Sequence, residues 1–190
     1  MGCDIHLKLE RRRKGSAEWH SVRMTRYQCW GDRIYGMFAR LANVRNNPEW
    51  GVVPLPMRGW PEDAAYDTFR AYCCEVVSDE DYEENEEMYD RWDDDYINET
   101  KANEWVEDGL SVEMSHDFYK GRRFISDPDA HSVNWCTTEE MRRCVDECFF
   151  EEGKPKPYAD FVEWCSLLGA MEGIERGGYY ECRAIYWFDN

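Results

Sequence analysis

The sequence predicts an α+β fold, in which a small antiparallel sheet from both chain termini carries helices packed on one face. Near the start, Ile5, Leu7 and Leu9 alternate with polar residues, which is typical of a strand with one buried side. Near the end, GGYYECRAIYWFDN is an alternating aromatic strand. Between these segments apolar residues recur mostly at helical spacing, so helices are expected to cover the sheet.

The first half of the chain is expected to hold a hairpin and two helices. A polar Gly-Ser turn in RRKGSAEW separates the first strand from a returning strand in WHSVRM. Residues 31–46 have helical spacing, with Asp32 as N-cap and a proline soon after the end. The prolines and glycines of GVVPLPMRGWP exclude regular structure there. A second helix is predicted over residues 62–76, directly after Pro61.

The second half is expected to be mainly helical before the last strand. Helical pieces are predicted within the acidic stretch at about 78–108. A loop carrying DPDAHSVNWC then leads into a helix capped by Thr137 or Thr138 with Glu140 or a neighbour, because a hydroxyl there satisfies free amides. The last helix, over residues 156–174, is expected to place on one side Phe161, Cys165 and Leu168.

Most of the net charge lies in one stretch of the sequence. The 190 residues have a formal net charge of −17. From residue 78 to residue 108, fifteen Asp or Glu stand against two basic residues, Arg91 and Lys101, a balance of −13. The sequence therefore predicts a single domain over residues 1–190, with an acidic insertion at about 78–108.

The composition also limits the partners and the compartment. Phosphate backbones and anionic lipids would repel so acidic a chain, so we expect neither nucleic acid nor a membrane as partner. No apolar run approaches the ~20 residues of a membrane helix. Nine cysteines, an odd number without an apolar signal segment, indicate reduced thiols in the cytoplasm. The aromatic content of 15% is compatible with a homo-oligomer.

Asp4 and His6 are the first candidates for a site. Two positions apart on a strand, they share one face, so they could contact a ligand together. They could also be the solvated side of an edge strand. Metal ligation is a third alternative, but it needs further ligands such as His131 or Asp189, which have no diagnostic spacing.

Arginines on the stiff central segments are the second group of candidates. Arg45 and Asn46 leave a helix end, and Arg58 precedes a glycine between prolines. A guanidinium on a rigid loop can hold a phosphate with two hydrogen bonds, and an amide can hold a ribose. The alternative for both arginines is a salt bridge to one of the many carboxylates.

The segment AHSVNW supplies the third group. His131 and Ser132 precede a helix, where free amides attract anions, so this loop could contact a ligand. A nucleophilic Ser-His pair is not expected, because adjacent side chains seldom face each other. Trp135 could stack on a base or belong to the core. No phosphate-binding loop, dinucleotide glycine pattern, HExxH or EF-hand is present, which argues against ATP-driven chemistry.

Five blocks, MGCDIH, FARLANVRN, PMRGWPED, AHSVNW and WFDN, together resemble an uncharacterised protein family scattered through bacteriophages and bacteria. Members often carry a longer His-Ser run where this chain has HSVNW, with Val133 in place of a second histidine. That departure weakens any dinuclear metal scheme. The resemblance implies a shared pattern of residues: Asp4, His6, Arg45, Asn46, Arg58, Gly59, His131, Ser132, Trp135, Asp189 and Asn190.

If the first and last strands are neighbours, the patterned residues of the two termini meet in one polar cleft. Such a cleft suits a compact, phosphate-bearing ligand such as a nucleotide. The expected ligand-binding residues are Asp4, His6, Arg45, Asn46, Arg58, His131, Ser132, Trp135 and Asp189. The leading hypothesis is a phage-type protein that sequesters a host immune signalling nucleotide, an anti-defense role that needs no metal or cofactor.

Two other functions stay open at this point. A metal-dependent phosphoesterase could use Asp4, His6, His131 and Asp189 around one divalent ion. An acidic interaction protein could instead dock the carboxylates of residues 78–108 on a basic host factor. Whether the chain is an enzyme is therefore undecided by the sequence.

Overall fold

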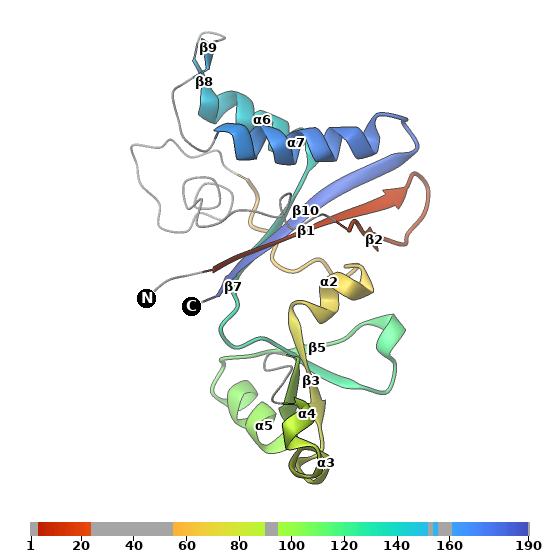
Figure 1. Cartoon of the computed structure of the whole chain (residues 1–190), viewed down its shortest axis with the longest axis vertical. Coiled ribbons are helices and arrows are strands. Elements are labelled where there is room, and N and C mark those ends of the chain that lie inside the picture. The colour runs from red at the N-terminus through yellow and green to blue at the C-terminus, as the bar shows by residue number, and fades with distance from the viewer. Residues whose placement is uncertain (1–3, 24–54, 90–94, 152–153, 156–160, 190) are drawn as a thin grey trace. The chain divides into compact units, whose positions relative to one another are not determined.

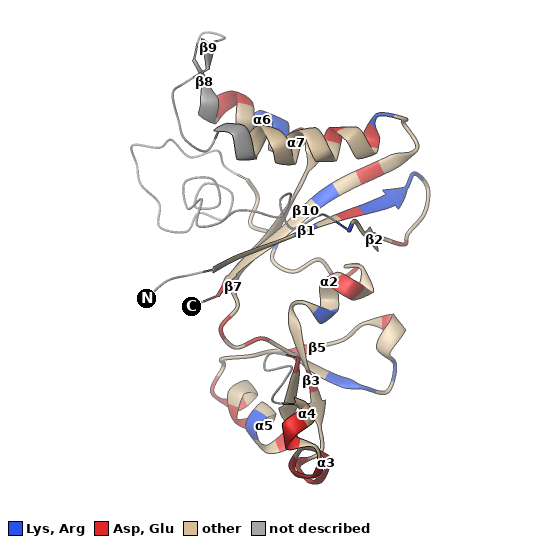
Figure 2. Cartoon of the chain, viewed as in Figure 1, with Lys and Arg blue, Asp and Glu red and all other residues tan. Residues whose placement is uncertain are grey.

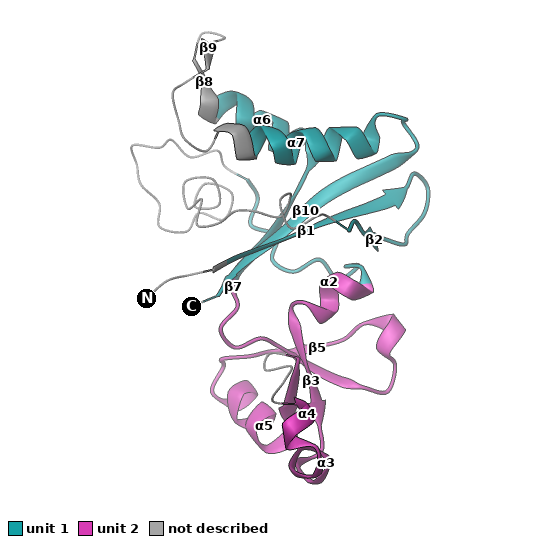
Figure 3. Ribbon diagram, in the orientation of Figure 1, with its two compact units in different colours: residues 1–65, 132–190 teal, residues 66–131 magenta. Residues whose placement is uncertain are grey.

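The computed structural model describes residues 4–23, 55–89, 95–151, 154–155 and 161–189. Within these residues the protein is α+β, as the sequence predicts, and none of the described helices is long and apolar enough to span a membrane. The chain divides into two compact units (Figure 3). Unit 1 comprises residues 1–65 and 132–190, and unit 2 comprises residues 66–131. Arg45, Asn46 and the helix predicted around them lie outside the described residues.

Two long strands from opposite ends of the chain form the centre of unit 1. β1 (Asp4–Arg13) and β10 (Tyr180–Asp189) are antiparallel and pair along their full length, as Figure 1 shows. β2 (His20–Ser21) lies on the other side of β1, and β7 (His131–Thr137) lies beside β10. The predicted hairpin and the predicted sheet from both termini are therefore confirmed.

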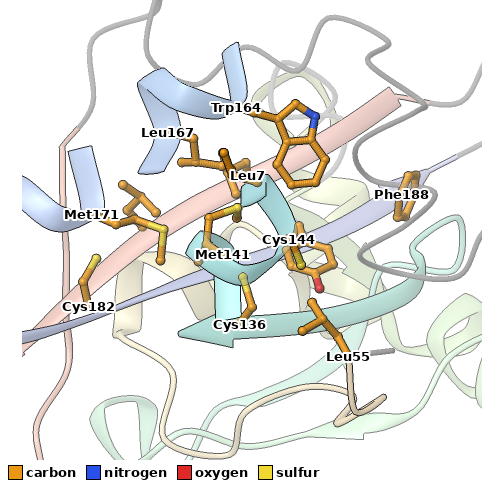
Figure 4. Packing of buried hydrophobic residues seen from close by; sticks show 14 residues of the cluster. Leu7, Leu55, Cys136, Met141, Cys144, Trp164, Leu167, Met171, Cys182 and Phe188 are labelled. Atoms are coloured by element: carbon orange, nitrogen blue, oxygen red, sulfur yellow. The ribbon is translucent and has the colours of Figure 1, made fainter. Parts of the chain in front are cut away.

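Helices cover one face of this sheet. α6 (Thr138–Phe149) and α7 (Phe161–Glu175) lie together over the strands (Figure 1). In the chain between the two helices, the short strands β8 (Phe150–Glu151) and β9 (Lys154–Pro155) pair with each other. The core lies between the helices and the sheet (Figure 4). Its fully buried members include Leu9, Cys136, Met141, Cys144, Trp164, Met171, Ala184 and Tyr186.

Unit 2 has its own sheet, in the order β4-β3-β6-β5. The strands are β3 (Cys73–Val77), β4 (Tyr96–Asn98), β5 (Glu113–Met114) and β6 (Arg123–Ser126). The helices are α2 (Tyr66–Arg70), α3 (Asp79–Glu84), α4 (Glu86–Tyr89), α5 (Glu99–Glu107) and the 3-10 helix η3 (Asp117–Tyr119). The acidic stretch thus lies within a larger folded unit, and many of its acidic residues lie on α3 and α4 (Figure 2).

The two units differ sharply in charge. Residues 66–131 contain 21 acidic and 6 basic residues, a balance of −15, whereas the 19 acidic and 17 basic residues of unit 1 give −2. Unit 1 therefore has a nearly balanced charge, and almost all of the negative charge of the protein belongs to unit 2.

Two expectations for single elements are wrong. The helix predicted over residues 62–76 is a helix only at Tyr66–Arg70, because Cys73–Val77 is strand β3, a central strand whose β-branched Val76 and Val77 suit a sheet. The segment expected as a loop before α6 is strand β7.

The apolar side of α7 packs on the core. Among its described side chains, Trp164, Leu167 and Met171 are buried, and Cys165 and Leu168 are partly buried against the same cluster.

Candidate functional site

His6 and Asp189 form a direct pair at the end of the sheet where both termini lie. Asp4 is opposite Asp189 in the register of β1 and β10, and His6 Nε2 is hydrogen-bonded to Asp189 Oδ2 at 2.7 Å. The imidazole also stacks on Trp187, with ring centroids 5.1 Å apart and planes 4° apart. The side chains of His6 and Asp189 are 40% and 28% exposed. The pair therefore presents a partly exposed imidazole that a carboxylate and an indole hold in place.

Arg58 has its donors engaged by residues of unit 1. Its guanidinium makes two hydrogen bonds to the Glu140 carboxylate, at 2.5 and 3.1 Å, and one to the Trp135 carbonyl. Its backbone N–H donates to Asn134 Oδ1 at 2.9 Å. Of the two alternatives that the sequence leaves open for Arg58, the structure contains the salt bridge.

Glu140 links this arginine to the start of α6. The carboxylate accepts the backbone N–H of Thr137 (2.9 Å), and the Thr137 hydroxyl accepts the Glu140 N–H (3.3 Å), so the predicted capping arrangement is present. Burial raises the pKa of Glu140, but hydrogen bonds from Arg58 and from the Thr137 amide outweigh it and hold that pKa below the ordinary 4.5. The ion pair therefore keeps this carboxylate charged.

His131, Ser132 and Trp135 lie along β7. Ser132 has φ 55°, a left-handed conformation that is uncommon for residues other than glycine. Trp135 is partly buried and lies under the Arg58 guanidinium, 4.4 Å from its ring centroid. His131 ends unit 2 and is described with that unit. Among the described residues, no group of three or more His, Cys, Asp and Glu side chains could hold a metal ion.

A pocket of about 520 Å³ lies in unit 1. Its walls come from β1 and the turn after it, the segment before α2, β7, the start of α6, the end of α7 and the start of β10. Of the predicted site residues that the structure describes, Trp135 alone lines this pocket. The lining residues are Arg12, Trp19, Asp63, Trp135, Thr137, Thr138, Glu139, Arg142, Glu175, Glu181, Cys182 and Arg183.

Guanidinium groups and indole rings alternate along one wall of this pocket. The Cζ atoms of Arg12 and Arg183 lie 4.7 and 4.0 Å from the ring centroid of Trp19. Arg183 lies 5.6 Å from the ring of Trp135, whose other guanidinium neighbour is Arg58. Cation–π contacts of this kind are attractive and geometrically specific. We call these five residues the Arg–Trp ladder, and its contacts fix the positions of both indoles.

Carboxylates hold the arginines of the ladder in place. Arg12 Nε donates to Glu181 at 2.6 Å, and Arg183 donates to Glu10 and to Asp63. Glu10 and Arg183 are almost fully buried, and the second Glu10 oxygen accepts the Ala65 amide at 2.7 Å. Paired charges therefore hold Arg12 and Arg183, two of the lining arginines, in place.

Asp63 belongs to the same network. Burial raises the pKa of Asp63, but the hydrogen bond and charge of Arg183 and the hydrogen bond from the Trp19 indole N–H outweigh burial and leave that pKa below 3.8. Asp63 thus stays charged beside Arg183 over the physiological pH range.

The start of α6 also faces the pocket. Thr138, the first residue of this helix, is 2% exposed, and its Oγ1 has no hydrogen-bond partner among the described residues. Arg142, one helical turn later, lines the pocket as well. Its ion pairs with Glu139 and Glu172, at 3.6 and 3.0 Å, are between exposed side chains.

Sequence reasoning missed most of the pocket. Arg12 and Glu181 carry opposite charges on the two terminal strands, and this complementarity becomes informative only once the register of β1 and β10 is known. Trp19 lies after a turn, where nothing in the local pattern separates a pocket residue from a core residue.

No family model, no curated protein and no solved structure matches this chain.

Proposed function

We propose that this protein binds a small, nucleotide-like molecule in the pocket of unit 1 and holds it without turnover. The observation that carries the proposal is the pocket. Ligand sites are typically concave spaces of roughly 300–1,000 Å³ with flat apolar walls and a few fixed polar groups. A volume of about 520 Å³ beside two positioned indoles and two threonines meets that description.

The chemistry of the lining is complementary to a nucleotide. Carboxylates of Glu175 and Glu181 accept hydrogen bonds from sugar hydroxyls. The planar guanidinium of Arg12, whose side chain is one-third exposed, offers a stacking surface and donors for an oxygen-rich ligand. Because the Arg–Trp ladder already fixes these groups, little conformational entropy is lost when a ligand enters. Tight binding therefore needs no rearrangement of the Arg–Trp ladder.

Stoichiometric retention of a signalling nucleotide is the role we propose for this binding. It agrees with the resemblance of the sequence blocks to a family found in bacteriophages, for which removal of a host immune signal is an advantage. A protein of this kind acts by mass action, so its concentration sets how much signal it removes.

The test is an incubation of the protein with cyclic nucleotides, cyclic ADP-ribose isomers and cyclic dinucleotides, followed by mass spectrometry of the free fraction before and after heat denaturation. We expect one compound to leave the free fraction and to return with unchanged mass on heating. If no compound in the panel is depleted, the proposal is wrong.

A matched pair of variants connects the binding to this pocket. Trp135→Ala removes one indole of the Arg–Trp ladder and should reduce retention. Trp105→Ala removes an indole of unit 2 that also has a cation–π neighbour, Lys101 at 5.0 Å, and should not reduce it. Circular dichroism of both variants separates loss of binding from loss of fold.

One observation favours a second function, a metal-dependent phosphoesterase. The His6–Asp189 pair, with Asp4 opposite Asp189 in the register, places one histidine and two aspartates, residue types common at divalent metals, on neighbouring strand positions. A metal there would polarise a phosphoryl oxygen and activate water. A changed ligand mass in the same incubation, lost in chelator and in His6→Ala, would replace sequestration by this function.

A further inference from the structure

We infer that the start of α6 is a phosphate subsite of the pocket, with the Thr138 hydroxyl and the Arg142 guanidinium as its side-chain donors. This inference rests on the proposed function and deepens it, because it assigns one end of the ligand to one part of the pocket. Three independent features of the described residues lead to it.

The first feature is the hydroxyl of Thr138, which is buried and has no hydrogen-bond partner within the described part of the chain. Buried polar groups are nearly always hydrogen-bonded, and one that is not calls for a reason such as a missing ligand or water. A threonine on a helix populates two side-chain rotamers, which exchange its hydroxyl and methyl group. Thr138 lines the pocket, so we infer that a ligand oxygen there draws the hydroxyl into the rotamer that faces it.

The second feature is the helix start. α6 has 12 residues, and the amides of the first turn of a helix have no partners within it. The Thr137 hydroxyl takes the amide of Glu140, so the cap engages the third of these groups and leaves those of Thr138 and Glu139 to other acceptors. Such amides, together with the helix dipole, favour an anion.

The third feature is the position and availability of Arg142. Four residues after Thr138, it lies on the same face of α6. Its partners Glu139 and Glu172 are 89% and 43% exposed at the side chain, and ion pairs this exposed exchange readily. Arg183, by contrast, is fixed in the buried pair with Glu10. Arg142 is therefore the lining arginine that is best able to turn to an incoming phosphate.

The remaining charges of the pocket restrict the ligand further. Glu175 and Glu181 line it near the start of β10, where the Glu175 carboxylate accepts the Cys182 amide, so an anion is disfavoured there. Glu139 lines it at the start of α6, but its side chain is 89% exposed and pairs with Arg142, so its charge is the more strongly screened. Carboxylates suit hydroxyl donors. The ligand class is accordingly a phosphate ester that carries free sugar hydroxyls at its other end.

The experiment uses the full chain and four proteins: wild type, Thr138→Val, Arg142→Gln and Arg143→Gln. Valine has the shape of threonine without the hydroxyl, and Arg143 is an exposed neighbour on α6 that does not line the pocket. Each protein is titrated calorimetrically with inorganic phosphate, adenosine 5′-monophosphate and adenosine, and its melting temperature is measured without ligand.

We expect wild type and Arg143→Gln to bind the monophosphate more tightly than adenosine. Thr138→Val and Arg142→Gln should lose about tenfold or more in affinity for the monophosphate, because each removes a hydrogen bond to a charged group. Thr138→Val should melt no lower than wild type without ligand, since the hydroxyl that it removes is unpaired. A lower melting temperature would show a structural hydroxyl and overturn the inference.

The remaining outcomes separate the subsite from the proposed function. Equal binding of adenosine and its monophosphate, or equal phosphate affinity in all four proteins, overturns the subsite and leaves nucleotide binding intact. Phosphate binding that is lost in Thr138→Val and Arg142→Gln, with no nucleotide of the panel retained, supports the subsite and removes the proposed function.

Discussion

Glu10 and Arg183 face each other across β1 and β10, and the 2.7 Å ion pair between them is almost completely removed from water. The pair lies on the face of the sheet opposite the core helices, since Leu9 and Ala184 point the other way. Through Asp63 and the amide of Ala65 it also fixes the segment before α2. One charge pair thus joins both termini and one wall of the pocket.

Removal of the Glu10 charge should destabilise unit 1 strongly. In Glu10→Gln the Arg183 guanidinium keeps Asp63 but loses its buried partner, and breaking a buried pair typically costs about 3–5 kcal/mol. Glu181→Gln breaks the half-exposed pair with Arg12 and should cost about 0–1 kcal/mol. Urea unfolding measures both. Similar free energies of unfolding for the two variants would contradict the importance given to the buried pair.

Acid should weaken the fold through Glu140 and Asp63. The pKa of each lies below its ordinary value, 4.5 for Glu140 and 3.8 for Asp63, so the unfolded chain takes up protons first as the pH falls. Their contribution is complete above the unfolded pKa and is lost as the pH falls through the lower folded pKa. Urea unfolding from about pH 6 to about pH 3 should show falling stability.

Variants of two adjacent glutamates test that assignment. Glu140→Gln should be less stable near neutral pH and should lose less stability on acidification. Glu139→Gln is the matched control, because the exposed Glu139 carboxylate pairs with Arg142, whereas Arg58 pairs with Glu140. A pH profile that is the same in wild type and Glu140→Gln would assign the acid sensitivity elsewhere.

The core thiols should resist alkylation in the folded protein. Burial raises the pKa of Cys182 to about 12 and the pKa of Cys136 well above 9.0, so little thiolate forms at about pH 8. Iodoacetamide followed by peptide mapping should leave both unmodified until urea unfolds the chain. Cys165, which is only partly buried, should react earlier. Equal labelling rates for the three thiols would contradict the burial of the core.

The effect of a charge reversal on α3 should depend on its position in the helix. A lysine near the C-terminal end should stabilise unit 2, and a lysine in the first turn should destabilise it. Glu84 lies at the C-terminal end of the helix and Glu80 in its first turn, four residues before it. Glu84→Lys favours the helix dipole and pairs with Glu80, which should add about 0.3–1 kcal/mol. Glu80→Lys makes the same charge change but opposes the dipole, so it should destabilise. The measurement is the melting temperature of each variant at low and at high salt. Equal changes in melting temperature for Glu84→Lys and Glu80→Lys would mean that only net charge matters and would contradict the prediction.

The pairing of the two terminal strands could be predicted from the sequence, because alternation at both ends specifies strands whose apolar sides must share a core. The Thr137–Glu140 cap was equally accessible, since its signal is local. Strand β3 could not be predicted from the sequence. Its residues, CCEVV, continue a helical pattern, and only their place between β4 and β6 decides their conformation. For strands of this kind tertiary context overrides local propensity.

The candidate site was harder to predict for a related reason. Alternation placed Glu10 on the polar side of β1, where a solvated carboxylate is the ordinary expectation. Its burial depends on Arg183, 173 positions away, and on residues that cover that face. Trp135 was a candidate for base stacking, but its ring lies against Arg58. The local sequence pattern does not indicate that two charged residues from distant segments form an ion pair.

The pairing of β1 with β10 also determines when unit 1 can assemble. His6 and Asp189 are 183 positions apart, so β1 leaves the ribosome long before β10, its full-length partner, is made. Unit 2 draws its sheet from one continuous segment, and domains generally fold in the order of synthesis. During translation, unit 2 can therefore close while β1 is still exposed. The nascent N-terminal strand, with its alternating apolar side chains, is the part of this protein that a chaperone would most need to shield.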